Sequence, residues 1–255
     1  MNYFNFFFNL LKIPLRFLRF IYSIENLNKS EIDIIENLES PKKILTWNIH
    51  ELFLYTNFSK VKNIINRINN FDSDLICLQE AFEDETKKLI IEETKNKYPY
   101  FMVTTTEKKI VIGEDSGLLI LSKYPINFVF EKCFENLFFP DSLANKSVLY
   151  FTVGNLNFAT THLQSGYESI SESQINDILK NSPFEKFILL GDLNNRNVNN
   201  ILNIDCNNKE VTFYNEIIDY ILPINLTLNL KVDVLRIDLD NTSDHYPLLA
   251  KILNY

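Results

Sequence analysis

Residues 187–194 read FILLGDLN, an apolar run that ends in polar side chains. The run 187–190 is typical of a buried β-strand. Asp192 and Asn194 follow it directly. Strands are rigid and can hold the side chains at their ends in fixed directions, so functional residues are often found there. We therefore expect Asp192 and Asn194 to take part in the chemistry of this protein.

Four further segments place polar side chains at the edge of an apolar run. They are Thr46-Trp47-Asn48-Ile49-His50, Leu78-Gln79-Glu80-Ala81-Phe82, Thr161-His162-Leu163-Gln164 and Ser243-Asp244-His245-Tyr246-Pro247. The first three follow their apolar runs, and the last precedes one. The chain has 3 histidines, and all of them lie in these segments. This concentration indicates one shared functional site.

Each segment alone also has a structural explanation. Asn48 could form a turn, Glu80 could cap the next helix, and Asp244 could form a turn. Together, however, the segments offer carboxylate and amide oxygens, which suit a hard cation such as Mg²⁺ that also keeps waters and a substrate phosphate. Two histidines beside it could act as general base and as general acid or oxyanion donor. Zinc is disfavoured, because the sequence lacks closely spaced His and Cys ligands.

Strand and helix patterns succeed one another from residue 42 onward. Strands are expected at 43–48, 74–78, 101–105, 118–121, 127–130, 148–153, 158–161, 187–190, 211–213, 216–222, 226–235 and 246–253. Helices are expected at 58–70, 84–97 and 168–180, and residues 194–208 are loop-like. Because the helices do not strictly alternate with the strands, periodicity leaves open an α/β or an α+β domain. The many strands, with helices interspersed among them, indicate two packed sheets flanked by helices.

The first 41 residues differ from the rest of the chain. Residues 1–24 are rich in Phe and Leu, and Lys12, Arg16 and Arg19 share one face of a helix. Such a helix could lie in a membrane interface, or it could dock on the domain. Three charges and Pro14 disfavour a spanning helix. We expect 1–41 to be an apolar and basic segment with a linker, and 42–255 to be the catalytic domain.

Charge and cysteine content limit the partners of the protein. The net charge is −8 and the pI about 5.0, which disfavours non-specific nucleic-acid binding, because such binding rests on a basic surface. The 3 cysteines are scattered and form neither a disulfide framework nor a zinc cluster. They suit a reducing compartment. We expect an intracellular, cytoplasmic protein, either free or at a membrane surface. The oligomeric state is left open.

The ordered set Trp47-Asn48, Gln79-Glu80, Thr161-His162, Gly191-Asp192-Leu193-Asn194 and Ser243-Asp244-His245 resembles the endonuclease/exonuclease/phosphatase superfamily. The stretch 116–126, SGLLILSKYPI, is similar to the central strand pair of that superfamily, and 218–222, IDYIL, to its "IDYI" strand. The resemblance runs from about residue 42 to residue 252. It implies an α/β fold, a four-layer α/β/β/α sandwich of two packed mixed sheets flanked by helices. It also implies Mg²⁺-dependent attack of water on a phosphoester, with Mn²⁺ as a substitute for Mg²⁺.

The resemblance also implies a role for each site residue. Asn48, Glu80 and Asp244 would hold the metal, and Asp192 and Asn194 would position the nucleophile and the scissile phosphate. His245 would be the general base, held by Asp219, and His162 would donate to the phosphate or the leaving group. Lys146 would touch the substrate phosphate or, equally well, be an ordinary surface lysine. We assign no catalytic role to His50.

Within the superfamily, the motifs are most similar to neutral sphingomyelinases. Residues 74–82, the Tyr98-Pro99-Tyr100 run and the segments at 161–164 and 243–247 carry this likeness. It implies a phospholipid substrate, with peripheral membrane contact through residues 1–24. The alternative is an endonuclease or a 5′-tyrosyl-DNA type phosphodiesterase, which Thr46–Ile49 and Gly191–Arg196 also resemble. A non-catalytic binding or membrane-tethering module is a third interpretation.

Overall fold

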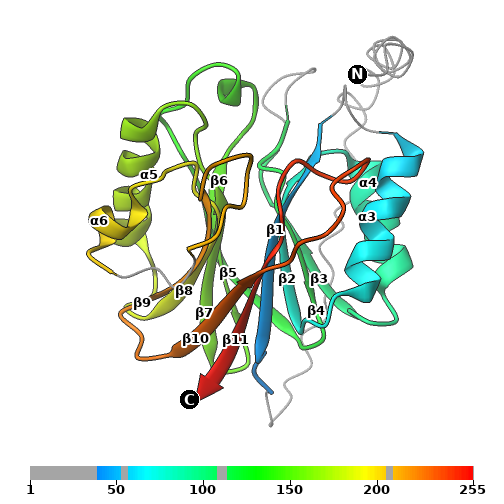
Figure 1. The fold of residues 1–255 in the computed structure, drawn as a ribbon. Helices are drawn as coiled ribbons and strands as arrows, with labels where there is room; N and C mark the ends of the chain where they lie inside the picture. The colour runs from blue at the N-terminus through cyan, green and yellow to red at the C-terminus, as the bar shows by residue number, and fades with distance from the viewer. Residues whose placement is uncertain (1–38, 53–56, 108–113, 205–208, 255) are drawn as a thin grey trace.

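Two β-sheets pack face to face, and helices cover the outer face of each (Figure 1). The computed structural model describes residues 39–52, 57–107, 114–204 and 209–254. The layers follow the order helix, sheet, sheet, helix. This confirms the α/β/β/α sandwich that the resemblance implies, and it decides between the α/β and α+β alternatives.

The first sheet has the strand order β10-β11-β1-β2-β4-β3. β1 (Lys43–Glu51) and β2 (Leu75–Ala81) run parallel, and the helix α3 (Phe58–Asn70) connects them. The other pairings are antiparallel and involve β3 (Tyr100–Val103), β4 (Leu119–Ser122), β10 (Asn229–Val234) and β11 (Leu248–Asn254). Helix α4 (Asp84–Thr94) lies beside α3 on the outer face (Figure 1).

The second sheet has the order β5-β6-β7-β8-β9. Here β7 (Leu156–His162) and β8 (Phe187–Asp192) are the parallel pair, connected through α5 (Glu168–Asn181). β5 (Ile126–Cys133), β6 (Ser147–Val153) and β9 (Asp219–Ile224) add antiparallel pairings. A short 3-10 helix, η1 (Asp141–Leu143), lies in the loop between β5 and β6, and α6 (Val198–Leu202) follows β8.

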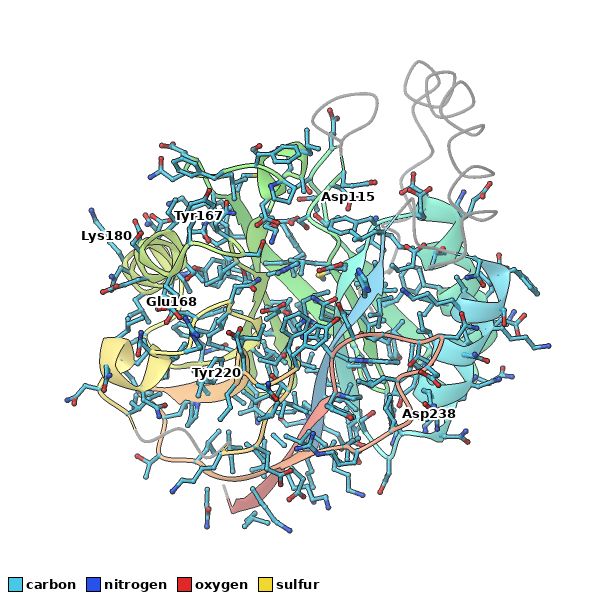
Figure 2. The ribbon with its side chains drawn as sticks, turned by 45° about the horizontal axis from the view of Figure 1, so that its top comes forward. Asp115, Tyr167, Glu168, Lys180, Tyr220 and Asp238 are labelled. Carbon is cyan, nitrogen blue, oxygen red and sulfur yellow. The ribbon has the colours of Figure 1, made fainter. Side chains whose placement is uncertain are left out.

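Three apolar layers hold the sandwich together. The central one lies between the sheets and joins Ile44 and Leu75 of the first to Phe158 and Ile188 of the second. A second layer lies under α3 and α4, and a third, which includes Tyr220, lies under α5 and α6 (Figures 1 and 2). Strands such as 187–190 read as continuous apolar runs because both of their faces are covered.

The expected elements are present, with ends shifted by a few residues, except in two places. Residues 211–213 form no strand, and Phe213 makes only isolated bridges to Glu216 and His245. The stretch 194–208 is not wholly a loop, because it contains α6. Asparagine favours turns, but the burial of Val198 in the third apolar layer outweighs this preference.

Two predictions for the N-terminal part, the helix at 1–24 and most of the linker, lie outside the described residues. The boundary at residue 42 therefore stays a prediction. Among the helices that the structure describes, none is both long and apolar enough to span a bilayer.

Candidate active site

The candidate site lies where the parallel strands of both sheets end. On neighbouring strands of the second sheet, His162 is paired with Asp192, and Asp192 with Asp219. Gly191 allows this close approach, because a Cβ atom there would lie 2.0 Å from the carbonyl oxygen of Thr161. Its φ of +138° is also one that other residues rarely adopt. The topology therefore gathers these side chains at one edge.

Asn48 joins the two sheets across the site. Its Nδ2 donates to Glu80 Oε1 at 2.9 Å and to Asp192 Oδ2 at 3.0 Å. Its Oδ1 accepts from the backbone N–H of His50 at 2.9 Å. Asn48 thus fixes the separation of two carboxylates, a role beyond the metal binding expected from the sequence. An amide oxygen has a second lone pair, which leaves metal binding open to it.

Glu80 and Asp244 fit the metal site predicted from the sequence. Glu80 Oε2 and Asp244 Oδ1 are buried and have no hydrogen-bond partner, as is also true of Asp219 Oδ1, and Asp244 Oδ1 lies 3.5 Å from His50 Nδ1. A buried carboxylate oxygen without a partner is costly. Oxygen ligands of this kind suit Mg²⁺. The donor set of Glu80 and Asp244, with Asn48 beside them, therefore fits a hard divalent cation.

Another group of ligand-type side chains is closer together. Ligand atoms of Asp192, Asp219 and His245 all lie within 4.8 Å of one another. One of these contacts is already a hydrogen bond, because His245 Nδ1 lies 2.9 Å from Asp219 Oδ2. We therefore interpret this group as a hydrogen-bonded acid–base unit, and a cation at Glu80 and Asp244 stays a prediction.

His245 is buried among carboxylates. Burial alone would lower the pKa of His245, but the charge and hydrogen bond of Asp219, with Asp192 and Asp244, outweigh burial and raise it to about 10. Its Nε2 lies 3.8 Å from Asp192 Oδ2 and so faces the site. Asp219 Oδ2 therefore orients the imidazole through Nδ1, and the role of Asp219 in holding a general base stays a prediction.

Two residues that sequence reasoning did not assign support His245. The Phe213 ring stacks on the imidazole with centroids 4.4 Å apart, and Trp47 Nε1 donates to the His245 backbone oxygen at 2.9 Å. Trp47 was visible as part of the first motif. Phe213 belongs to a stretch predicted as a strand, and its sequence carries no signal for contact with His245.

His162 has the opposite environment. Burial and the positive charges of Lys146 and His245 hold its pKa well below the usual value. Its Nε2 lies 3.6 Å from Asp192 Oδ2 and 3.8 Å from Glu80 Oε1. The Nε2 atoms of His162 and His245 thus face the same oxygen, Asp192 Oδ2, while their pKa values are shifted in opposite directions.

Lys146 is not a surface lysine. Its side chain is 1% exposed, and its ammonium contacts His162 Nε2 at 3.1 Å, the Leu163 oxygen at 2.6 Å and Asp141 Oδ1 at 2.7 Å. These three partners match the three N–H donors of a lysine. The surface interpretation is therefore wrong, because Asp141 compensates the buried charge. Sequence reasoning missed Asp141, because no motif marked it and nothing in the sequence indicated that Lys146 is buried.

Asp192 and Asn194 occupy the centre of the site. Burial and the neighbouring Asp219 raise the pKa of Asp192 to about 7, against the opposing effects of His245, Asn48 and Lys146. Asp192 Oδ1 accepts from the Asn194 backbone N–H at 3.0 Å, and Asn194 Nδ2 donates to the Leu163 oxygen at 3.0 Å. The two residues predicted to position substrate are therefore themselves held in place.

Three residues at this edge have a left-handed backbone conformation. His50, Glu80 and Asn194 have φ values of +48°, +57° and +46°, in the left-handed region. Such conformations persist where the surroundings enforce them, and they cluster at functional sites. His50 Nδ1 lies 3.5 Å from Asp244 Oδ1, so it borders the proposed cation position.

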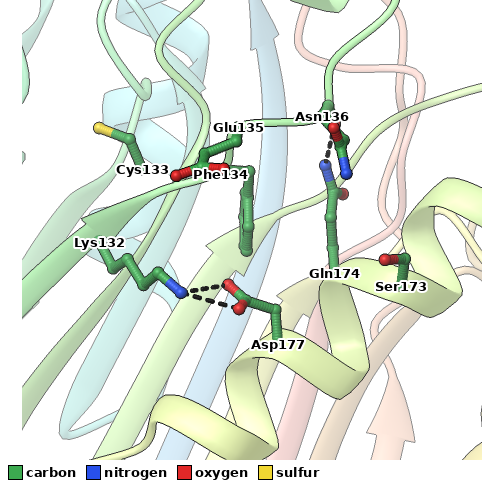
Figure 3. Close-up of a pocket in the computed structure, with 8 residues that line it drawn as sticks. All are labelled: Lys132, Cys133, Phe134, Glu135, Asn136, Ser173, Gln174 and Asp177. Carbon is green, nitrogen blue, oxygen red and sulfur yellow. Dashed lines mark hydrogen bonds and ion pairs between the residues drawn. The ribbon is translucent and has the colours of Figure 1, made fainter.

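A separate pocket of about 170 Å³ lies between the end of β5 and α5 (Figure 3). Its lining includes the ion pair of Lys132 and Asp177, whose Nζ and Oδ1 atoms are 2.7 Å apart. None of the site residues predicted from the sequence lines it. The candidate chemistry is therefore outside this pocket.

A model of the Endonuclease/Exonuclease/phosphatase family matches residues 45–245. The chain belongs to this family. The match includes every site residue predicted from the sequence.

Solved structures of other proteins have the same fold. Sphingomyelinase C from Streptomyces griseocarneus has a TM-score of 0.67 and 20% identity, covering 84% of this chain and 100% of that one. The beta toxin from Staphylococcus aureus, in a mutant structure with bound magnesium ions, has the same TM-score, identity and coverage. At this identity the likeness establishes the fold alone.

Curated relatives match over part of their length. A sphingomyelinase C from Bacillus cereus is 25% identical over 198 residues, which are 64% of this chain and 60% of the relative. A phospholipase C from Staphylococcus aureus is 25% identical over 143 residues, 48% of this chain and 43% of the relative. The chain thus spans less than two thirds of each of these relatives.

Proposed function

We propose that this protein is a Mg²⁺-dependent phosphodiesterase. The observation that carries the proposal is the convergence of Glu80, Asp192, His162 and the pair His245–Asp219 at one edge of the sandwich. Carboxylates for a cation, an oriented histidine and a second histidine of different charge are what hydrolysis of a phosphoester needs. Membership of the family and the names of its relatives support this chemistry.

The residues would divide the work as follows. His245, oriented by Asp219, accepts the proton of the attacking water, while Asp192 and Asn194 orient that water and the phosphate. His162, whose Nε2 already accepts from Lys146, would donate to a phosphate or leaving-group oxygen through Nδ1, which has no hydrogen-bond partner among the described residues. A divalent cation at Glu80 and Asp244 would offset charge on the phosphoryl oxygens and, by repulsion, lower the pKa of His245.

We further propose a sphingomyelin-type phospholipid as the substrate. Two of the relatives reported above are sphingomyelinases C and one is a phospholipase C. A net charge of −8 also suits a zwitterionic lipid better than a polyanionic nucleic acid. A purely non-catalytic role is disfavoured, because Asn48 and Asp192 connect Glu80 to His245 at hydrogen-bond and ion-pair distances.

The test is an assay of the purified protein with Mg²⁺ on sphingomyelin vesicles and on single- and double-stranded DNA. Glu80→Ala and His245→Ala should abolish phosphocholine release, and Glu92→Ala, at an exposed position on α4, should leave it unchanged. DNA cleavage that needs Mg²⁺ and that both substitutions abolish would identify a nucleic acid, and not a lipid, as the substrate. Inactivity on every phosphoester offered, soluble ones included, would overturn the proposal.

A further inference from the structure

An exposed aromatic cluster borders the candidate site. Phe138, Phe139 and Tyr167 are 52%, 73% and 48% exposed. The rings of Phe138 and Tyr167 are in contact, with centroids 5.3 Å apart. We call these three residues the aromatic ridge. Large apolar side chains gathered on a surface mark a place where something binds.

A chain of contacts attaches the ridge to the catalytic residues. The Phe138 backbone N–H donates to Gln164 Oε1 at 2.7 Å, and Gln164 Nε2 donates to Asp141 Oδ2 at 2.8 Å. Asp141 in turn holds Lys146, which contacts His162. Gln164 is fully buried, so this connection is part of the rigid structure. Whatever occupies the ridge is therefore held at a fixed position relative to His162.

The second part of the ridge lies at the start of α5. Tyr167 immediately precedes this helix, which begins at Glu168, and Figure 2 labels both residues. The segment 163–167 also connects β7, and with it His162, to α5. The ridge is thus built from the two loops that flank His162 and Lys146 in the chain.

Another exposed aromatic residue lies near the other histidine. Tyr214 is 75% exposed, and its ring meets that of Phe213 edge-on with centroids 4.6 Å apart. Phe213 is the residue that stacks on His245. Exposed rings therefore border the site near both histidines.

Charge indicates what the ridge would bind. Segments 136–140 and 163–167 contain no charged side chain, and the whole chain is acidic. Binding to a nucleic acid needs cations that neutralise phosphates. Aromatic side chains, by contrast, favour the boundary between lipid headgroups and acyl chains. An uncharged aromatic surface therefore fits a neutral lipid interface.

We propose that the aromatic ridge inserts into the surface of a zwitterionic lipid layer and holds a headgroup phosphodiester over the candidate site. This inference rests on the proposed function and extends it. It assigns contact with the lipid to the loop between β5 and β6 and to the start of α5.

The experiment compares the full chain with Phe139→Ser and with the double variant Phe138→Ser/Phe139→Ser. Sedimentation with vesicles of phosphatidylcholine and sphingomyelin measures binding. Hydrolysis is measured on the same vesicles and on bis(p-nitrophenyl) phosphate, a soluble phosphodiester. Phe128→Ser is the matched control, because Phe128 is 47% exposed but pairs with Phe151, near the strand ends opposite His162.

The double variant should bind vesicles about tenfold more weakly than the wild type, and Phe139→Ser alone should show a smaller loss of binding. Hydrolysis in vesicles should fall in parallel, while hydrolysis of the soluble substrate and the unfolding midpoint stay unchanged. The role of the ridge would be contradicted if the double variant bound and hydrolysed vesicles as well as the wild type does. An equal loss of vesicle binding in Phe128→Ser would also contradict it. If the double variant bound DNA more weakly than the wild type but bound vesicles equally well, the lipid role of the ridge would be contradicted as well.

These outcomes are separate from failure of the proposed function. Wild-type protein that is inactive on the soluble phosphodiester, yet binds vesicles through Phe138 and Phe139, would retain the lipid contact and remove the phosphodiesterase. Protein that is active on the soluble phosphodiester, but whose vesicle binding is unchanged by substitution of both phenylalanines, would support the phosphodiesterase and contradict the lipid contact.

Discussion

His245 depends on its neighbours more than any other residue of the site. Of the groups around it, Asp219 does most to raise the pKa of His245, through its charge and its hydrogen bond. Asp219→Asn should therefore lower this pKa from about 10. In the metal-free protein, the raised pKa contributes stability that is fully present below the unfolded-state value of about 6.5 and is lost as pH rises toward 10. The variant should lose less stability over this window.

Urea unfolding at pH 6, 8 and 10, without metal, measures this contribution, and NMR titration of the His245 ring measures the pKa directly. Phe213→Leu is a useful comparison, because it removes the ring stacked on His245 and leaves the carboxylate in place. An unchanged pKa in Asp219→Asn would contradict the electrostatic account.

Glu80 should decide whether the protein binds a divalent cation. Its unpartnered buried Oε2 would gain a ligand on metal binding. We expect Mg²⁺ at 100 times its dissociation constant to stabilise the wild type by about 2.7 kcal/mol. Glu80→Gln should lose most of this stabilisation. Thermal unfolding with and without Mg²⁺ measures it without any assay of activity, and equal stabilisation of both proteins would place the cation elsewhere.

At the level of elements, Lys146 attaches the loop between β5 and β6 to His162 at the end of β7, and a buried ion pair with Asp141 of the same loop holds this lysine. Lys146 is 1% exposed and the Asp141 side chain 12%. Removing one partner of such a pair leaves an uncompensated charge and costs about 3–5 kcal/mol. Lys146→Met should therefore destabilise the protein by about this amount and should also slow hydrolysis, because it releases His162.

Replacing both partners tests this explanation. Lys146→Met/Asp141→Asn should recover part of the stability, because no unpaired charge remains, but should not recover activity. Urea denaturation gives the free energies of unfolding for a double-mutant cycle. Additive losses would mean that the two residues act independently.

For the whole molecule, the prediction concerns the first 38 residues. The sandwich formed by the described residues has its own three apolar layers. Ser40 Oγ accepts from the Asn155 backbone N–H at 2.9 Å, so a chain that begins at residue 39 keeps this contact. Deletion of residues 1–38 should leave folding and hydrolysis of a soluble phosphodiester unchanged. If residues 1–24 contact membranes, vesicle binding should fall in the same variant.

Loss of folding after this deletion would contradict the boundary predicted near residue 42. Circular dichroism and unfolding midpoints measure folding, and sedimentation with vesicles measures membrane contact. The Phe138→Ser/Phe139→Ser variant, tested beside it, separates contact through the aromatic ridge from contact through the N-terminal segment.

The sequence by itself determined where the strands run and which polar residues stand at their ends. Helix α3 was predicted at residues 58–70 as observed, and Asp192 was placed directly after an apolar strand. Such patterns are local, since burial of one face or of both leaves its mark within a few residues. The five motifs were informative together because their order matched that of a family.

Tertiary structure alone decided how these residues act on one another. Asn48 and Asp192 are 144 positions apart and hydrogen-bonded, and Asp141 compensates the charge that Lys146 brings beside His162. The opposite pKa shifts of His162 and His245 arise from the charges around each ring after folding. The strength of a Coulomb interaction depends on distance in space and on burial, and neither quantity is encoded in the spacing along the chain.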